Sequence, residues 1–249
     1  SLINALEDRK LRNYWASSGA TSLLPKFVDD MEMKMEYFDH CFIEGDTLET
    51  SDVVNGGAEL FLYQSGYLTI KGYDDGVYIL GFPNFEVRKA LYRVVVPALT
   101  MKSNSEVVSA QSFLRKMMQD GNTAEAKKAL KALIADVPYS NKKMASMDME
   151  ERYRLIMSTI FRALGFRVEV ERMLATGRID MIVEVPSFIY VLELKLSNNG
   201  GISAAESQIK EKSYTEPFKA DKRKVIALAV ELDETGKGLI DWKEVDESL

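Results

Sequence analysis

The stretch Gly177–Leu196, GRIDMIVEVPSFIYVLELKL, constrains the fold of this chain more strongly than any other. Two runs rich in Ile, Val, Leu and Tyr flank Pro186-Ser187, a pattern typical of two β-strands joined by a tight turn. A turn centred there brings apolar residues together on both faces of the hairpin. The facing pairs are Ile182 with Val191, Ile179 with Leu194, Met181 with Leu192, and Val183 with Tyr190. A hairpin that is apolar on both faces belongs inside a sheet covered by other layers.

The same register brings two carboxylates together, because Asp180 then faces Glu193. Facing residues have Cβ atoms about 4.5–5.5 Å apart, and like charges in such a pair are destabilising. A divalent ion removes the conflict, and Mg²⁺ typically uses one or two protein carboxylates. Lys195 lies two residues beyond Glu193, so it points to the same face and can reach a phosphate or water held by the ion. The pattern therefore indicates a metal-dependent phosphodiesterase site.

A second interpretation of the hairpin needs no metal. In the predicted register Arg178 faces Lys195, and each of these cations can neutralise one of the two acids. Mixed charges on strands are common, and surface ion pairs of this kind carry little energy. The hairpin alone leaves both interpretations open.

An Asp at the start of one strand, followed by Glu-x-Lys late in the next, resembles the PD-(D/E)XK nuclease superfamily. More narrowly, the chain is similar to the bacterial nuclease-like family encoded behind an AAA-ATPase-like domain. The matching segments are GRID at 177–180, YVLELKL at 190–196, a preceding helix with Glu150 and Tyr153 that ends in LGF at 164–166, and a following helix with Gln208-Ile209 and Tyr214. Ile179, not Pro, precedes the Asp, as is usual in the narrower family. The likeness covers residues 140–249 well and the earlier part more loosely, through GYL at 66–68 and PNFEVRKAL at 83–91.

The resemblance implies an α/β fold in which a restriction-endonuclease-like mixed sheet is flanked by helices. It implies a nuclease that cleaves nucleic acid, with DNA the expected substrate, and leaves a 5′-phosphate. The expected metal ligands for Mg²⁺ or Mn²⁺ are Asp180, Glu193 and the backbone oxygen of Leu194. The further expected catalytic residues are Lys195, Glu150 and Gln208, and the expected substrate-binding residues are Arg178, Lys210 and Tyr214. Glu150 is expected to lean toward the metal from the helix before the hairpin.

Composition argues against several other classes of function. The formal net charge of −6 argues against a general nucleic-acid coat protein, although acidic metal ligands contribute to it. The only histidine, His40, lies beside the only cysteine, Cys41, which weighs against a catalytic triad and against a tetrahedral zinc site. A single cysteine forms no internal disulfide and suits a reducing compartment, so we expect a cytoplasmic protein. No apolar run approaches the length of a membrane span, so no membrane partner is expected.

The chain divides into three predicted regions. Residues 1–100 are expected to form a mostly helical, winged-helix-like module, which the resemblance implies to be the tail of an AAA-ATPase-like region with its ATPase core upstream, absent from this chain. It contains a hairpin across Asp74-Asp75-Gly76 and a helix from Asn84 to Val96 stopped by Pro97. Residues 101–139 are expected to form bridging helices, and residues 140–249 the nuclease-like domain. The chain has no GxxxxGK[ST] phosphate loop, so we expect it not to hydrolyse ATP.

Further elements follow from periodicity and capping signals. The predicted helices and strands include helices at 2–15, 21–35, 55–64, 106–118, 123–135 and 149–164, and strands at 42–48, 166–171, 225–232 and 239–242. Ser197–Gly201 is expected to be a flexible loop, with Ser203 and Glu206 forming a capping box at the start of the next helix. Ser140–Met147 is the expected linker.

Two classes of function are compatible with these patterns. The first is a metal-dependent nuclease coupled, in the full-length protein, to the upstream ATPase-like domain. The alternative is a catalytically inactive nuclease fold that serves as an interaction or DNA-binding module, for which the winged-helix-like half is the natural surface. The complete set of Glu150, Asp180, Glu193 and Lys195 favours the enzyme, and the sequence leaves the oligomeric state open.

Overall fold

The structure is a computed structural model that describes residues 35–50, 56–100, 102–135 and 147–246. The chain divides into two compact units, one up to Val95 and the other from Val96 onward. The helices predicted at 2–15 and 21–35 and the linker predicted at 140–147 fall almost entirely outside the described residues. None of the helices in the described ranges has both the length and the apolarity needed to cross a membrane.

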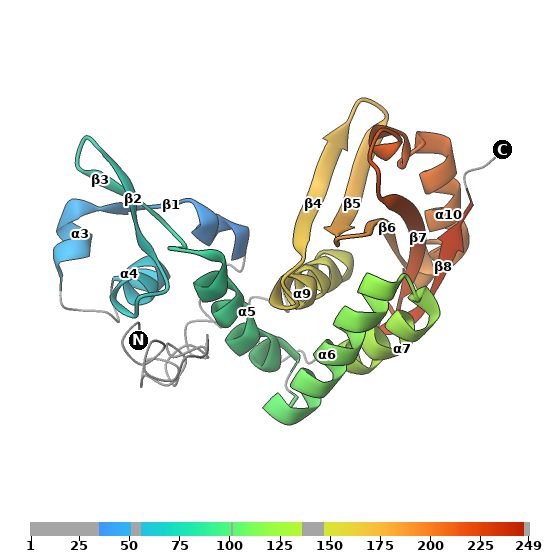
Figure 1. Cartoon of the computed structure of the whole chain (residues 1–249), viewed down its shortest axis with the longest axis horizontal. Helices are drawn as coiled ribbons and strands as arrows, with labels where there is room; N and C mark the ends of the chain where they lie inside the picture. Colours follow the sequence, from blue (N-terminus) through green and yellow to red (C-terminus); the bar gives the residue numbers. More distant parts are fainter. Residues whose placement is uncertain (1–34, 51–55, 101, 136–146, 247–249) are drawn as a thin grey trace. The chain divides into compact units, whose positions relative to one another are not determined.

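The first unit contains a three-stranded antiparallel sheet in the order β1-β3-β2 (Figure 1). Its elements are the 3-10 helix η2 (Met35–Asp39), β1 (Cys41–Glu44), α3 (Gly45–Glu49), α4 (Gly57–Gln64), β2 (Thr69–Asp74), β3 (Val77–Gly81) and the larger part of α5 (Phe85–Thr100), whose last residues belong to the second unit. The hairpin predicted across Asp74-Asp75-Gly76 is confirmed as β2–β3. The strand predicted at 42–48 is wrong in its second half, where Gly45 begins a short helix.

The predicted stop at Pro97 is also wrong, because α5 runs through this residue to Thr100. Its start is as expected, since the Asn84 side chain accepts a hydrogen bond from the backbone N–H of Val87. Proline lacks the N–H that would bond one turn back and normally ends or kinks a helix. Here Val96 and Leu99, on either side of Pro97, are buried. Burial of the last turn therefore offsets the lost hydrogen bond.

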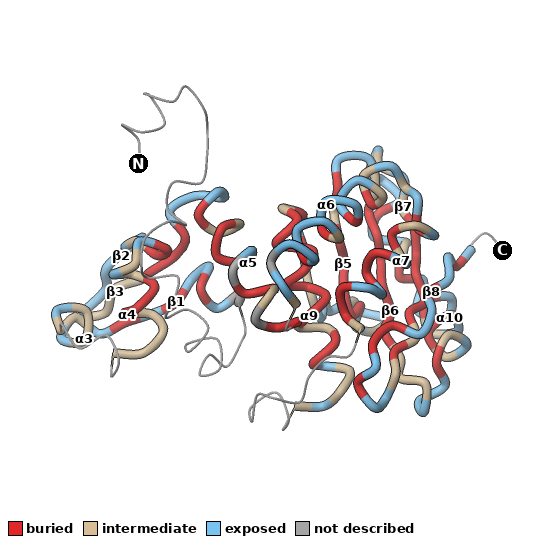
Figure 2. Tube along the Cα trace, turned by 90° about the horizontal axis from the view of Figure 1, so that it is seen from below, coloured by how far each residue is buried: buried red, intermediate tan, exposed pale blue. Residues whose placement is uncertain are grey.

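The second unit is built on a five-stranded mixed sheet in the order β4-β5-β6-β7-β8. The strands are β4 (Arg167–Leu174), β5 (Gly177–Glu184), β6 (Phe188–Leu196), β7 (Lys224–Leu232) and β8 (Leu239–Val245). All neighbouring strands are antiparallel except β6 and β7, which are parallel and are connected through helix α10 (Gly201–Lys212). The strand predicted at 225–232 is thus confirmed beside the central hairpin. Figure 2 shows long buried stretches along β5, β6 and β7.

The predicted hairpin register is confirmed over the part that is paired. Met181 pairs with Leu192, Ile182 with Val191 and Val183 with Tyr190, and the N–H of Val185 donates to the carbonyl of Phe188 across the turn. The ladder between β5 and β6 ends at Met181 and Leu192, although both strands continue. The expected pair of Asp180 and Glu193 lies one step beyond this end, where the two strands separate.

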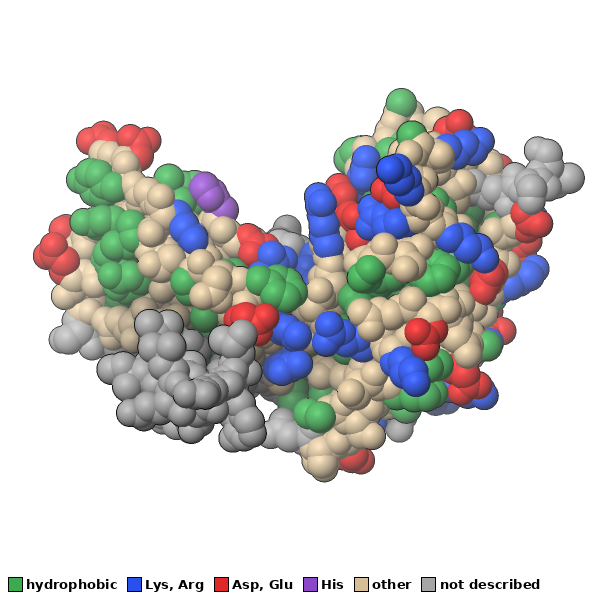
Figure 3. All heavy atoms as spheres, in the orientation of Figure 1, with side chains coloured by type: hydrophobic (Ala, Val, Ile, Leu, Met, Phe, Trp, Pro, Cys, Tyr) green, Lys and Arg blue, Asp and Glu red, His purple; other side chains and the backbone are tan. Residues whose placement is uncertain are grey.

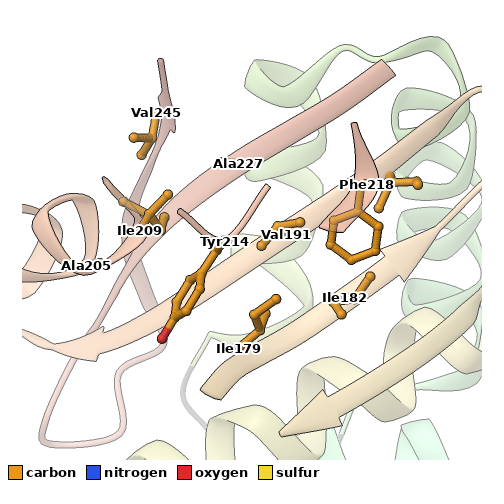
Figure 4. Packing of buried hydrophobic residues seen from close by; sticks show 11 residues of the cluster. Ile179, Ile182, Val191, Ala205, Ile209, Tyr214, Phe218, Ala227 and Val245 are labelled. Atoms are coloured by element: carbon orange, nitrogen blue, oxygen red, sulfur yellow. The ribbon is translucent and has the colours of Figure 1, made fainter. Parts of the chain in front are cut away.

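Helices cover both faces of the sheet, as the two-sided apolar hairpin predicts. On one face, α10 and the segment after it pack on the hairpin and on β7; Figure 4 shows Ile179, Val191, Ile209 and Tyr214 in this cluster. Tyr190 points to the opposite face, and its hydroxyl donates to the carbonyl of Met118 at 2.6 Å. Met118 belongs to α6 (Asn104–Asp120), which is followed by α7 (Thr123–Ile134).

The helices expected to bridge the two halves lie within the second unit, where they contact the sheet. The indole N–H of Trp242 on β8 donates to the carbonyl of Thr123 at the start of α7. Gly121, in the left-handed conformation between the two helices, is so close to Phe188 that an added Cβ would lie 2.5 Å from its ring. Helix α9 (Met149–Ala163) contacts β4, β5 and β6.

The start of α10 differs from the prediction. The expected flexible loop is a short 3-10 helix, Ser197–Asn199, and α10 begins at Gly201 without a side-chain cap. Glu206 does not form a capping box with Ser203, because its carboxylate accepts from Lys210 and Lys243. The N–H of Ile202 instead donates to Glu231 of β7 at 3.3 Å. A partner on another strand therefore replaces the local cap.

Candidate metal centre

Asp180 lies where β5 and β6 part, and it is 4% exposed. Its Oδ2 accepts a hydrogen bond of 2.9 Å from the backbone N–H of Leu194. Because the ladder has ended, this N–H would otherwise lack a strand partner on β5, and a buried N–H without a partner is costly. The separation of the strands therefore directs the Asp180 carboxylate toward the backbone of β6, next to Glu193.

Glu193 is completely buried, and only one of its carboxylate oxygens is hydrogen-bonded. Oε1 accepts from the ammonium group of Lys195 at 2.8 Å, whereas no hydrogen-bond donor of the described residues reaches Oε2. Burial raises the pKa of Glu193 to about 8; the charge of Asp180 also raises it, and Lys195 opposes the shift. An unsatisfied buried oxygen costs about 1–3 kcal/mol, more when it is charged. A cation bound at Oε2 would remove that cost.

The ammonium group of Lys195 contacts two of the candidate metal ligands. Besides Glu193, its ammonium group donates to the carbonyl oxygen of Leu194 at 3.2 Å. Burial works to lower the pKa of Lys195, but the hydrogen bond to Glu193 and the charges of Glu193, Asp180 and Glu150 raise it above its usual value. Lys195 is therefore positively charged at neutral pH.

Glu150 reaches the edge of this group from the first turn of α9. The helix begins at Asp148, whose side chain accepts from the N–H of Glu150. Glu150 is half-buried; desolvation raises its pKa, Lys195 lowers it and Asp180 raises it further, with a net upward shift. The neighbouring Glu151 is exposed. The structure thus brings Glu150, and not Glu151, into the electrostatic environment of Asp180 and Lys195.

Two residues that sequence reasoning missed complete the charged cluster. Nη1 of Arg154 lies 3.3 Å from Oδ1 of Asp180 and 3.3 Å from Oε1 of Glu171. Arg178 contacts the same oxygen of Glu171 at 3.0 Å. Arg154 follows Glu150 by one helical turn, a spacing that places both on one helix face and was visible in the sequence. The contact of Glu171 with Arg154 was not visible, because it depends on how β4 pairs with β5 and packs against α9.

The remaining predicted site residues fall into two groups. Gln208 donates to the hydroxyl of the buried Tyr214, which donates to the backbone carbonyl of Arg178 at 2.7 Å. This chain of hydrogen bonds holds the start of β5, two residues before Asp180. Lys210 is exposed on α10 and pairs with Glu206 at 3.0 Å. The structure directs Lys210 to Glu206, away from the acidic pair.

The donor set fits a hard divalent ion. In the described part of the chain no group of three or more His, Cys, Asp or Glu side chains is arranged to hold a metal. The candidate set is smaller, with the carboxylates of Asp180 and Glu193 and the carbonyl of Leu194. Mg²⁺ and Mn²⁺ prefer oxygen ligands, and Mg²⁺ commonly uses one or two carboxylates and keeps several waters. The unpartnered Oε2 of Glu193 is the atom that such an ion would satisfy.

In the second unit, the mixed sheet carries an acidic pair and a lysine where two of its strands part. Residues 148–242 match the family model described as the PD-(D/E)XK nuclease superfamily. This range includes β4 to β7 and every residue of the cluster described above. The match indicates a metal-dependent nuclease, and members of this superfamily generally use divalent metals.

A relative in Azotobacter chroococcum mcd 1, "Uncharacterized protein in vnfD 5'region", is 24% identical to the chain. The alignment covers 100% of this chain and 48% of the relative, so the chain spans about half of the relative's length. No solved structure matches.

Proposed function

We propose that this chain carries a metal-dependent nuclease domain that hydrolyses phosphodiester bonds of nucleic acid, with DNA as its substrate. One observation carries the proposal: the fully buried Glu193 keeps an oxygen without a donor, next to Asp180 and with the ammonium group of Lys195 on its other oxygen. Burying two carboxylates this close is expensive unless a cation holds them together.

The chemistry follows from the positions of the side chains. Asp180, Glu193 and the Leu194 carbonyl would hold Mg²⁺ or Mn²⁺, which supplies a Lewis acid and an activated water when bound. Lys195 stays charged and would stabilise the negative charge that develops on the attacked phosphate. Glu150, whose pKa desolvation raises, would support the site from α9 beside Lys195.

The substrate would enter from the side of Arg178. The Arg178 side chain is 50% exposed, and its partner Glu171 also pairs with Arg154, whose side chain is 11% exposed. Arg178 therefore places a positive charge at the rim of the cluster. We infer that Arg178 contacts a phosphate of the nucleic acid. Gln208 and Tyr214 would act through the backbone of Arg178, and Lys210 would add charge only at the periphery. In Figure 3 basic and acidic side chains are interspersed over this unit. This distribution agrees with binding of nucleic acid through local contacts at the rim of the charged cluster.

The remainder of the protein is also part of the proposal. In the first unit the strand order β1-β3-β2, with α3 and α4 between β1 and β2, supports a winged-helix-like module. The likeness to proteins in which such a module follows an AAA-ATPase-like domain supports an ATPase-like domain upstream. We infer that the nuclease is coupled to this domain in the full-length protein.

A second function is favoured by one specific observation. Arg154 pairs with Asp180 and Lys195 pairs with Glu193, so each acid already has a cationic partner. A closed set of ion pairs would allow the nuclease fold to persist as an inactive scaffold that binds a partner or DNA. The two functions differ in whether the protein cleaves nucleic acid when a divalent ion is added.

The test is a cleavage assay with labelled single-stranded and double-stranded DNA and RNA, in Mg²⁺, Mn²⁺ or EDTA. We expect cleavage of DNA that needs metal, and its loss by about a hundredfold or more in Asp180→Ala and in Lys195→Ala. Lys128→Ala is the matched control, because Lys128 is an exposed lysine on α7 paired with Glu125. Cleavage that survives in both site variants would refute the mechanism. Metal binding without any cleavage would favour the scaffold.

A further inference from the structure

Arg154 is a mostly buried cation shared between two carboxylates that differ in their surroundings. Its side chain is 11% exposed, and its Nη1 lies 3.3 Å from both Asp180 and Glu171. The Asp180 side chain is even less exposed, at 6%, whereas that of Glu171 is 46% exposed. Arg154 can therefore be neutralised from two directions, one toward the acidic pair and one toward solvent.

The ion pairs show which cation serves Asp180. Lys195 donates to Glu193 and to the Leu194 carbonyl, and Arg178 pairs with Glu171. Arg154 is the cation that pairs with Asp180 among the residues that the structure describes. A buried carboxylate without a cation or several hydrogen bonds is strongly unfavourable. Arg154 therefore supplies the positive charge that Asp180 needs when no metal is bound.

A divalent ion bound at Asp180 would make the nearby charge of Arg154 unfavourable. With the ion bound, a guanidinium 3.3 Å from the same carboxylate would add a like charge beside it. Glu171 is already in contact with Arg154, so release from Asp180 would not leave the guanidinium unpaired. Glu171 is also one of the few residues other than glycine with a left-handed backbone, at φ 54° on β4. This conformation marks a local irregularity of the strand directly beside the site.

We propose that Arg154 is a built-in substitute for the metal ion: it neutralises Asp180 in the metal-free protein and yields it to a divalent ion, turning to Glu171. This inference rests on the proposed metal-dependent function and adds to it a residue that sets the metal affinity. Because the guanidinium and the ion compete for one carboxylate, a protein without Arg154 binds the ion more tightly and is less stable without it.

The experiment measures Mn²⁺ binding to the full chain by titration calorimetry, and the melting temperature without metal, for the wild type and three variants. Arg154→Gln removes the competing charge, and we expect Mn²⁺ to bind about tenfold more tightly, with a lower melting temperature of the metal-free protein. Arg154→Lys keeps a charge but lacks the planar fork, so its affinity should lie between those of the wild type and Arg154→Gln. Arg167→Gln is the control, because Arg167 is an exposed arginine on β4 that pairs with Glu184 outside the charged cluster; its affinity should stay within about threefold of the wild type.

The outcomes separate this inference from the proposed function. Mn²⁺ that binds the wild type but binds Arg154→Gln equally or more weakly would overturn the role of Arg154 and leave the nuclease proposal in place. Should neither the wild type nor Arg154→Gln bind Mn²⁺, both proposals fail. Should Arg154→Gln not fold, Arg154→Lys decides alone, since an affinity no tighter than that of the wild type contradicts the competition.

Discussion

Glu193 links the energetics of the fold to the proposed chemistry. Its folded-state pKa of about 8 exceeds the ordinary value of 4.5, so the folded protein binds a proton more tightly than the unfolded chain does. Between these two values the folded state holds the proton and the unfolded state has lost it, and stability then decreases as pH rises. The groups that act on Glu193 are Asp180, which strengthens this effect, and Lys195, which weakens it.

We therefore predict that the metal-free protein loses stability relative to Glu193→Gln as the pH rises from about 5 to about 8. The amide of the variant has nearly the same shape and does not titrate. The measurement is the denaturation free energy of both proteins across this range without metal. A difference between them that is independent of pH would show that Glu193 is not held protonated by burial.

Arg154 and Glu171 are residues of the candidate site that could not be identified from the sequence alone. The helical spacing of Glu150 and Arg154 was available from the sequence, but an arginine on a helix face is usually solvated and no pattern distinguished this one. Its role depends on the contact of α9 with β4 and β5, which brings Glu171 and Asp180 to it. The roles of Asp180, Glu193 and Lys195 follow from one hairpin, and their proximity was accessible from its register.

At the scale of the elements, the turn between α6 and α7 is a sensitive contact with the sheet. Gly121 has φ 73°, and an added Cβ would meet the Phe188 ring at 2.5 Å. We predict that Gly121→Ala destabilises the protein by about 1 kcal/mol through the backbone and by a further 1–3 kcal/mol through overpacking. The measurement is chemical denaturation of the variant and the wild type.

The control is a double-mutant cycle with Phe188→Leu. Without the aromatic ring only the backbone cost should remain, so Gly121→Ala should cost about 1 kcal/mol in that background. An equal cost in both backgrounds would show that α6 and α7 do not approach β6 as described.

Elements whose signals are local were predicted well, and elements that depend on distant partners were not. The hairpin register follows from the turn at Pro186-Ser187, which fixes which residues face each other. The end of α6 at Gly121 follows from the preference of glycine for the left-handed conformation. The start of α10 was missed because Glu231 of β7 serves its N–H groups, and the end of α5 was missed because burial around Pro97 outweighs the lost hydrogen bond.

At the scale of the whole molecule, the contacts of α6 and α7 decide which part of the chain folds alone. Tyr190 and Trp242 on the sheet bond to Met118 and Thr123 of these helices, and both side chains are buried. We predict that a fragment of residues 103–249 unfolds in one cooperative transition. A fragment of residues 140–249, which matches the expected nuclease-like domain alone, should expose an apolar face of the sheet and show no such transition.

The comparison uses circular dichroism during thermal unfolding of both fragments and of the full chain. Equal melting temperatures for the two fragments would show that α6 and α7 are dispensable and that the domain begins near residue 140. Such a result would support the three-region division expected from the sequence.

The most direct test of the central claim is anomalous diffraction from crystals soaked in Mn²⁺. The account predicts one strong peak between Asp180 and Glu193, with both carboxylates and the Leu194 carbonyl at about 2.0–2.4 Å from the ion. The Arg154 guanidinium should then lie on Glu171. An absence of any peak there, with Lys195 and Arg154 still holding the two acids, would contradict the claim that this buried pair is built to bind a metal.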